Sequence, residues 1–142
     1  MLTYFTNLYT NMLSYFYDNR YYYLSLKKDK ETYTIHGLWP QYSKTSYPKF
    51  CKKVNFSIDS LEPIIDELNK KWDSSKESNE EFWKHEYTKH GSCMFIDLTE
   101  LEYFQKTLDL YNYIISNNIL DNYDKNLNQI LIPFDLNFKL II

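Results

Sequence analysis

The sequence predicts an α+β fold in which an antiparallel sheet packs against several helices. Two observations support this class. Segments rich in strand-forming residues lie near both ends of the chain, and three segments between them combine helical periodicity with capping signals. A chain of 142 residues is long enough to bury one modest core. We therefore expect a single domain over residues 1–142.

The first strand-forming segment covers residues 21–39 and reads YYYLSLKKDKETYTIHGLW. Its charged run KKDKE predicts a turn between two strands, with residues 33–38 as the second strand. This places His36 near the end of that strand and Trp39 in an exposed turn after it. At the other end of the chain, LNQILIPFDLNFKLII predicts one or two further strands.

The first helical segment is predicted to begin at Asp59, which can cap a helix together with Glu62 three residues later. Apolar residues then recur at helical spacing, at Leu61, Ile64, Ile65, Leu68 and Trp72. The polar tract at residues 73–81 predicts a loop before the next helix.

The second and third helical segments repeat the capping pattern. Ser78 with Glu81 precedes a helix that we expect Gly91 to terminate. Thr99 with Glu102 precedes the third helix. Its predicted buried stripe consists of Leu101, Phe104, Leu108, Tyr111 and Ile115.

The net charge of −3 argues against a protein that attracts nucleic acid by long-range electrostatics, so any such contact must be local. Lysines do cluster, within residues 27–30 and 44–53, but a solvated surface explains these clusters equally well. The chain holds 15 Tyr, 9 Phe and 3 Trp. We expect most of these rings in the core and a minority as stacking platforms for nucleobases.

Membrane association and export leave few traces in the sequence. No segment approaches the roughly 20 apolar residues of a membrane helix, so we expect no membrane partner. The N-terminal stretch MLTYFTNLYTNMLSYFYDNR lacks a cationic start and does not resemble a signal peptide. Cys51 and Cys93 fit either one disulfide or two unrelated buried thiols.

Residues 82–93, FWKHEYTKHGSC, bring histidine, glutamate and lysine close together on the second predicted helix. A zinc-binding helix of the HE-x-x-H type needs two histidines four residues apart. His85 and His90 are five apart and diverge by about 140° around the helix. Lys89, which would repel a cation, occupies the position of the second ligand. We therefore predict that no metal binds here.

A helical wheel gathers five chemically capable side chains of this segment into an arc of about 140°. They are Phe82, His85, Glu86, Lys89 and His90. Glu86 and His90 are four residues apart, so the carboxylate can hold the imidazole and favour its charged form. Periodicity alone leaves both an acid–base site and an ordinary polar surface open.

The third histidine of the chain favours the acid–base site. Residues 36–40, HGLWP, resemble the first active-site segment of the ribonuclease T2 family, and residues 82–93 resemble its second, FWxHEWxKHGTC. Residues 47–51, YPKFC, also resemble the YPxxC element of this family. The resemblance covers mainly residues 21–116.

The resemblance implies an endoribonuclease that acts on single-stranded RNA without a metal or another cofactor. In this reaction the ribose 2′-hydroxyl attacks the adjacent phosphorus, and a 2′,3′-cyclic phosphate forms before hydrolysis to a 3′-phosphate. By the same resemblance His90 is the general base and His36 the general acid. His85 contacts phosphate, while Glu86 and Lys89 stabilise the transition state. Opposite protonation of two imidazoles implies a bell-shaped pH–rate profile.

Base binding follows from the same resemblance. Trp39 and Tyr47 match positions that sandwich the base 5′ to the cleaved bond, and Phe82 matches a platform for the base 3′ to it. Stacking tolerates many bases, which implies low base specificity. Gln41 stands where the family often has Asp or Asn, so the resemblance does not define a base preference.

The resemblance also pairs Cys51 with Cys93 in a disulfide, which implies a secreted or endolysosomal setting. The chain departs from the family after YYYLSL, where a WPxxxC segment is missing. The family core normally continues for several more strands, so we expect the C-terminal strands to be absent. We expect a monomer, although no feature of the sequence specifies the oligomeric state.

Two alternatives remain beside the enzyme. One is a non-catalytic RNA-binding or interaction protein of the same family, and the other is a structural relic without activity. The enzyme interpretation requires that the rings of His36 and His90 lie close enough to flank one phosphorus atom. It also requires that neither ring is buried beneath packed side chains.

Overall fold

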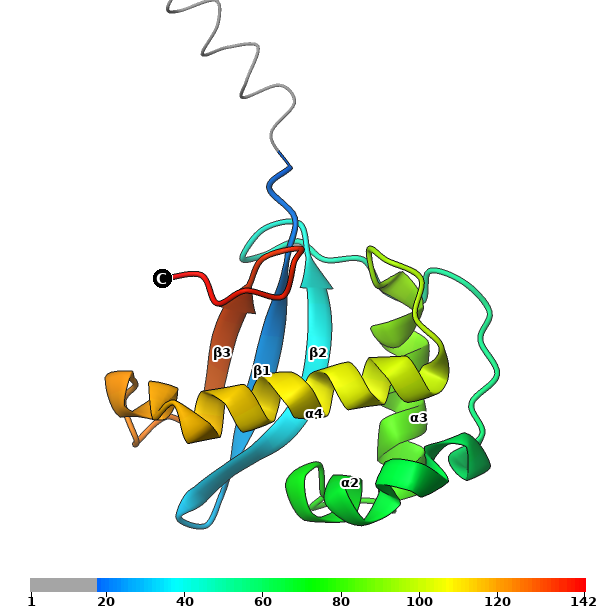
Figure 1. Cartoon of the computed structure of the whole chain (residues 1–142), viewed down its shortest axis with the longest axis horizontal. Coiled ribbons are helices and arrows are strands. Elements are labelled where there is room, and N and C mark those ends of the chain that lie inside the picture. Colours follow the sequence, from blue (N-terminus) through cyan, green and yellow to red (C-terminus); the bar gives the residue numbers. More distant parts are fainter. Residues whose placement is uncertain (1–17) are drawn as a thin grey trace, which may run out of the picture.

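The computed structural model describes residues 18–142, and a three-stranded antiparallel sheet forms its centre (Figure 1). Strands β1 (Tyr21–Asp29) and β2 (Thr32–Gln41) form a hairpin, and β3 (Gln129–Phe134) pairs with the other side of β1. The strand order is β2-β1-β3, which makes β2 an edge strand. The α+β class and the hairpin at the charged turn are confirmed. The N-terminal segment at residues 1–17, for which we expect no signal peptide, lies outside the described residues.

The hairpin contains a β-bulge at His36. Ser25 pairs with Gly37 and Leu26 pairs with Ile35, so His36 is an extra residue between two paired positions. The bulge shifts the alternation of side chains along β2. Ile35 and Leu38, three residues apart, are consequently both fully buried in the core.

The bulge also corrects two expectations from the sequence. His36 lies inside β2 rather than near its end, and Trp39 belongs to the same strand rather than to an exposed turn. A bulge allows a strand to continue through a local irregularity, whereas the sequence pattern shows only the irregularity.

The first helical segment begins differently from the prediction. A short 3-10 helix η1 (Ile58–Ile64) precedes the α-helix α2 (Ile65–Lys71). Ser57 rather than Asp59 precedes the first turn, and no side chain caps it. Pro63 has no backbone N–H and disfavours α-helical geometry at Glu62, which explains why the regular helix starts only at Ile65.

The capping signals of the next two helices are confirmed. Helix α3 (Asn79–Lys89) begins at Ser78, whose hydroxyl accepts a hydrogen bond from the Glu81 amide at 3.2 Å. Helix α4 (Glu100–Ser116) begins with a complete capping box between Thr99 and Glu102.

Helix α3 ends near the predicted residue for a different reason. The chain passes directly into a 3-10 turn, η2 (Gly91–Cys93), and Gly91 does not adopt a left-handed conformation. A Cβ atom at Gly91 would lie only 2.8 Å from Cδ2 of Tyr87. The glycine is therefore required by close packing, not by its backbone freedom.

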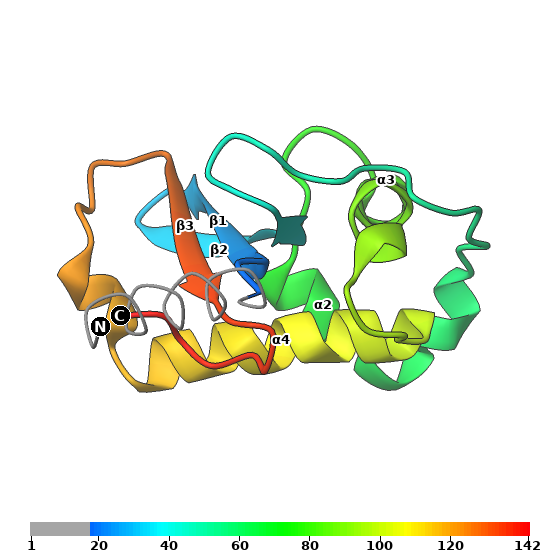
Figure 2. The ribbon, with the colours of Figure 1, turned by 90° about the horizontal axis from the view of Figure 1, so that it is seen from above.

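Helix α4 crosses one face of the sheet, as Figure 2 shows from above. The predicted stripe of α4 is partly wrong, because Ile115 is 44% exposed whereas Ile114 is fully buried. The buried residues of α4 are Tyr103, Phe104, Thr107, Leu108, Leu110 and Ile114. The rings of Tyr103 and Phe104 form an aromatic core with Trp72 and Trp83 between the sheet and the helices.

Three aromatic residues of the helical layer donate hydrogen bonds to backbone carbonyls of β2. Trp72 Nε1 donates to the carbonyl of His36 at 2.9 Å. The hydroxyls of Tyr103 and Tyr111 donate to the carbonyls of Leu38 and Tyr33 at 3.0 and 2.8 Å. These bonds fix the helical layer against the strand that carries His36.

Within residues 18–142, no helix is both long and apolar enough to span a membrane. After α4, a short 3-10 helix, η3 (Ile119–Asn122), leads towards β3.

Candidate active site

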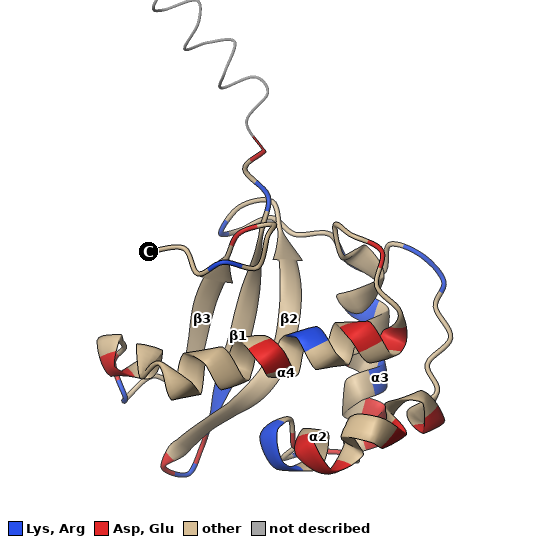
Figure 3. Ribbon diagram, viewed as in Figure 1, with Lys and Arg blue, Asp and Glu red and all other residues tan. Residues whose placement is uncertain are grey.

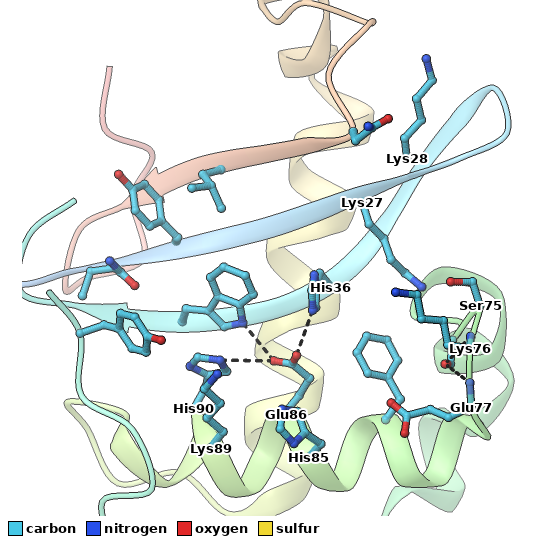
Figure 4. A pocket seen from close by; sticks show the side chains of 18 of the residues that line it. Lys27, Lys28, His36, Ser75, Lys76, Glu77, His85, Glu86, Lys89 and His90 are labelled. Atoms are coloured by element: carbon cyan, nitrogen blue, oxygen red, sulfur yellow. Dashed lines mark hydrogen bonds and ion pairs between the residues drawn. The ribbon is translucent and has the colours of Figure 1, made fainter. Parts of the chain in front are cut away.

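The cleft between β2 and α3 has a volume of about 720 Å³ and is drawn in Figure 4. All nine residues predicted to act on or bind substrate line it. Strand β2 contributes His36, Trp39 and Gln41, and the following loop contributes Tyr47. Helix α3 contributes Phe82, His85, Glu86 and Lys89, and His90 follows as its C-cap residue. The five side chains that the wheel placed on one arc of α3 therefore share one cleft.

The carboxylate of Glu86 lies at the centre of the cleft and is only 2% exposed. One carboxylate oxygen, Oε1, is 3.2 Å from Nε2 of His36, and the other, Oε2, is 3.8 Å from Nε2 of His90 (Figure 4). Trp39 Nε1 donates a hydrogen bond to Oε2 at 3.0 Å. A single carboxylate thus links the two histidines, one from each wall of the cleft.

Gly37 makes the position of this carboxylate possible. A Cβ atom on Gly37 would lie 2.4 Å from Oε2 of Glu86 and 2.5 Å from Nε1 of Trp39. Any larger residue would displace one of these two groups, because real Cβ atoms do not approach so closely. The glycine after His36 is therefore part of the site.

His90 is more buried than the sequence interpretation requires, with an exposure of 4%. The indole of Trp39 stacks on its ring at 5.0 Å between centroids, and Tyr47 lies 6.0 Å away. Nδ1 of His90 has no hydrogen-bond partner among the described residues. The requirement that His36 and His90 lie close together is met, whereas the requirement that neither is buried is not.

Burial lowers the pKa of His90 from 6.5 to about 4, although the nearby Glu86 carboxylate acts in the opposite direction. Glu86 favours the charged form of this imidazole, as its spacing on the helix predicts, but desolvation outweighs the attraction of the carboxylate. His90 is therefore neutral at neutral pH.

The other two basic groups of α3 lie at the rim. His85 is exposed, and its ring is 6.5 Å from that of Phe50. Lys89 is partly exposed, with its amine 5.9 Å from the centre of the Tyr47 ring. His36 has a half-exposed side chain, and its ring lies between those of Trp39 and Phe82 at 5.1 and 5.6 Å.

Gln41 and Phe82 also line the cleft. The Gln41 side chain is buried, and its amide donates to the carbonyl of Ser43 at 2.8 Å. One of its donors is thus used within the protein. Phe82 is largely buried, and the amine of Lys27 lies 5.0 Å above its ring.

Sequence reasoning missed the end of the cleft beyond Phe82. This end is lined by Lys27, Lys28, Ser74, Ser75, Lys76, Glu77 and Asn128. Lys27 donates to the backbone carbonyl of Asp73, and burial lowers the pKa of its amine. The lysine cluster at residues 27–30 was visible in the sequence, but nothing there indicated which of its members face the cleft.

The predicted disulfide between Cys51 and Cys93 is present, with a Cα–Cα distance of 5.1 Å across 42 residues of chain. The adjacent Ser92 hydroxyl accepts a hydrogen bond from the Cys51 amide at 3.1 Å. The loop after β2 is thereby tied to the end of α3. Among residues 18–142, no three His, Cys, Asp or Glu side chains are grouped closely enough to hold a metal ion.

Comparisons with known proteins identify the family that this sequence resembles. The model of the Ribonuclease T2 family matches residues 3–129. Ribonuclease DdI of Dictyostelium discoideum is 41% identical over 86 residues, which cover 59% of this chain and 39% of that protein. Ribonuclease MC of Momordica charantia is 38% identical over 82 residues, which cover 57% and 43%. The chain thus matches about two fifths of the length of these curated relatives.

Solved structures show the same fold. Trichomaglin, described as an S-like ribonuclease, superposes with a TM-score of 0.67 at 21% identity, over 85% of this chain and 89% of that one. Ribonuclease MC1 from the seeds of bitter gourd has a TM-score of 0.58 at 27% identity, over 66% and 58%. The arrangement of β2 and α3 around the cleft thus occurs within a fold already known from ribonucleases.

Proposed function

This chain belongs to the ribonuclease T2 family, and from this premise we propose that it is an endoribonuclease that cleaves single-stranded RNA. The reaction is a transphosphorylation that yields a 2′,3′-cyclic phosphate and then a 3′-phosphate, with low base specificity. The observation that carries the proposal is the placement of two imidazoles on one buried carboxylate inside an open cleft.

The first step needs one base and one acid on either side of the phosphorus atom. His90 removes the proton from the 2′-hydroxyl, whose oxygen then forms a bond to phosphorus. His36 donates a proton to the 5′-oxygen as the bond between phosphorus and that oxygen breaks. In the second step His36 accepts a proton from water, whose oxygen forms a bond to phosphorus. The bond between phosphorus and the 2′-oxygen breaks as His90 returns its proton to that oxygen, so each histidine regains its original protonation state.

The assignment of roles agrees with the surroundings of the two rings. His90 is neutral at neutral pH because burial lowers its pKa to about 4, so it can accept a proton. Nε2 of His36 lies 3.2 Å from Oε1 of Glu86, so the carboxylate can hold this ring in place on the other wall of the cleft. His85 and Lys89, at the rim, supply positive charge to the phosphoryl oxygens as negative charge develops there. These four side chains and Glu86 provide the acid, the base and the charge without a metal.

Trp39 has two positions in this proposal. In the structure it covers His90, whereas the family resemblance places it against a substrate base together with Tyr47. A rotation of the indole away from Glu86 would uncover His90 and form the base sandwich in the same motion. Phe82 then supports the base on the other side of the cleaved bond, and the engaged Gln41 amide contributes one free donor at most.

The test is cleavage of unstructured RNA in the presence of EDTA, followed by analysis of the ends. We expect cyclic-phosphate ends, a bell-shaped dependence of rate on pH, and loss of cleavage in His36→Ala and His90→Ala by about 10²–10⁴-fold. A rate that stays flat between about pH 4 and pH 8 would remove the two-histidine mechanism. Cleavage that depends on added metal would remove the metal-free proposal.

A second candidate is an RNA-binding protein of this family without catalysis. The burial of His90 beneath Trp39 favours it, because a covered base cannot reach a 2′-hydroxyl. Retarded but intact RNA in the same experiment would support this candidate and contradict the enzyme. Trp39→Ala, which uncovers His90, separates the two candidates further. If Trp39 blocks His90 in an RNA-binding protein, this variant should gain cleavage.

The remaining properties follow from the family and the disulfide. We propose a single catalytic domain over residues 1–142 that acts as a monomer in a secreted or endolysosomal setting. The Cys51–Cys93 bridge supports an oxidising environment. Non-reducing mass spectrometry of native material should show no free thiol at these positions.

A further inference from the structure

We propose that this chain has a second RNA-binding surface, outside the cleft, on the loop that follows β2. It consists of Lys49, Phe50, Lys52 and Lys53, and we call it the Phe50 surface. It would hold a nucleotide of single-stranded RNA beyond the two whose linkage is cleaved. The inference rests on the proposed function, since it places this surface on the path of the same RNA.

The charge of this region differs from that of the whole chain. Residues 32–58 contain no Asp or Glu, although the chain as a whole carries a net charge of −3. All four residues of the Phe50 surface are exposed, and Figure 3 shows basic residues along this loop. The contact of Lys52 with Asp97, at 3.9 Å, is a weak surface pair, and both side chains are exposed. The surface is therefore a local positive region on an acidic protein.

The ring of Phe50 is held in an exposed and unusual position. It is 54% exposed, and its backbone adopts the left-handed region with a φ of 49°, which bulky residues rarely enter. Its amide donates to the Lys89 carbonyl at 2.9 Å, and the following residue, Cys51, forms the disulfide with Cys93. These bonds fix the loop, so the ring is presented to solvent rather than left there by a flexible chain.

The Phe50 surface continues the cleft. The ring of Phe50 lies 6.5 Å from that of His85, which lines the cleft at its rim. Tyr47, three residues earlier on the same loop, lines the cleft directly, and the Lys89 amine faces its ring. An RNA chain that leaves the cleft past His85 therefore meets an aromatic ring flanked by lysines.

This combination fits single-stranded RNA in particular. A base stacks on an exposed ring regardless of its identity, and neighbouring lysines bind the phosphates on either side. An anionic membrane would also attract the lysines, but it favours several apolar side chains that insert together. The Phe50 surface has one ring, and this ring lies beside a cleft that we propose binds a phosphodiester. Single-stranded RNA is therefore favoured over a membrane.

The experiment uses the 142-residue chain and compares two substrates: a dinucleoside monophosphate, which fills only the cleft, and an unstructured ten-nucleotide RNA. Phe50→Leu should lower kcat/KM for the longer RNA about tenfold, through KM, and leave the dinucleotide within about twofold. Phe50→Tyr should retain the activity of the parent chain on both. Tyr113→Leu, which removes an exposed aromatic ring on α4, is the matched control and should change neither.

A second measurement keeps the test independent of catalysis. Binding of a 2′-O-methyl ten-nucleotide RNA, which lacks the attacking hydroxyl, is followed by fluorescence anisotropy at several salt concentrations. The combined change of Lys49→Gln and Lys53→Gln should reduce the slope of log affinity against log salt by about 1.4, since each phosphate contact on a single strand contributes about 0.7. A structural role for these lysines would leave the slope unchanged.

Each outcome decides the inference. Equal losses on the dinucleotide and the longer RNA, or no loss on either, would overturn it. So would Phe50→Leu weakening the binding of phosphatidylserine vesicles while leaving RNA binding intact. If the parent chain cleaves neither substrate, the proposed enzyme fails, yet the anisotropy measurements still support or overturn the Phe50 surface. An unchanged melting temperature of Phe50→Leu establishes that the effects do not arise from unfolding.

Discussion

The two walls of the cleft are encoded in different ways. The α3 wall brings its reactive side chains together because they recur at helical spacing, which a regular helix converts into one face. On the β2 wall, His36 and Trp39 are three residues apart, a spacing that puts side chains on opposite faces of a regular strand. They share the cleft because a bulge at His36 shifts the alternation. One wall thus depends on periodicity and the other on its interruption.

The two walls are also held in different ways. The end of α3 is tied by the Cys51–Cys93 disulfide, and the helix supplies its own hydrogen bonds. The β2 wall relies on strand pairing and on a glycine that leaves room for Glu86. We therefore expect loss of the disulfide that holds α3 to act mainly on stability, and a change of the glycine in β2 to act mainly on activity.

The largest expected effect is on the α3 wall. Replacing both cysteines, by Cys51→Ser and Cys93→Ser, should lower the free energy of unfolding by about 4 kcal/mol in the chain-entropy description of a 42-residue loop. Urea denaturation followed by tryptophan fluorescence measures the change. The parent chain under reducing conditions should show the same loss. Equal midpoints for the oxidised and reduced parent chain would show that the bridge does not stabilise this wall.

The next effect concerns the residue that joins the walls. Glu86→Gln keeps the size of the side chain but loses the charge beside His36 and His90, so we expect a fall in cleavage rate of about 100-fold. Glu81→Gln, at an exposed position on the same helix, is the control and should retain the activity of the parent chain. Equal rates for the parent and Glu86→Gln would separate the two walls functionally.

The two glycines allow the comparison to be made directly. Gly37→Ala, on β2, should displace Glu86 or Trp39 and lower the cleavage rate at least about tenfold, because its Cβ would lie 2.4 Å from the carboxylate. Gly91→Ala, after α3, meets the Tyr87 ring and should instead cost about 2 kcal/mol of stability through overpacking. Kinetics and denaturation of both variants test this. The reverse assignment of effects would contradict the distinction between the walls.

The smallest effect is a pH dependence of stability. The pKa of His90 falls from 6.5 in the unfolded chain to about 4 in the folded one, so the unfolded state binds more protons between these values. His90 therefore contributes stability in full above about pH 6.5, and this contribution decreases as the pH falls towards about 4. We expect a loss of about 1 kcal/mol from pH 7.5 to pH 5.5. His90→Gln should flatten this slope, and identical slopes would mean that His90 is not buried in solution.

Local signals made much of the fold predictable. Ser78 and Thr99 cap their helices as expected, because a cap depends only on residues within one turn. Asp59 failed as a cap because Pro63, farther along the segment, delays the helix. The shifted stripe of α4 shows a different limit, since Ile114 and Ile115 both fit helical spacing and only the neighbouring elements decide which is buried.

The candidate site also has features that the sequence predicts and features that it does not. The sequence allowed us to predict residues that share the cleft, because family motifs and the helical wheel bring them together. Their environment was not predictable, since the burial of His90 depends on where Trp39 lies across the cleft. The bulge at His36 and the left-handed backbone of Phe50 also leave no pattern in the sequence, because each is imposed by partners distant in the chain.

The bonds from Trp72, Tyr103 and Tyr111 to the carbonyls of β2 have a consequence for self-association. An edge strand ordinarily offers free acceptors on which another molecule can add a strand, and this is a common route to aggregation. Here three carbonyls of β2 accept bonds from side chains of the helical layer, and a bulge and Pro40 interrupt the regular pattern that an added strand would need. These features therefore disfavour the addition of another strand at β2, while the cleft beside this strand stays open to a ligand.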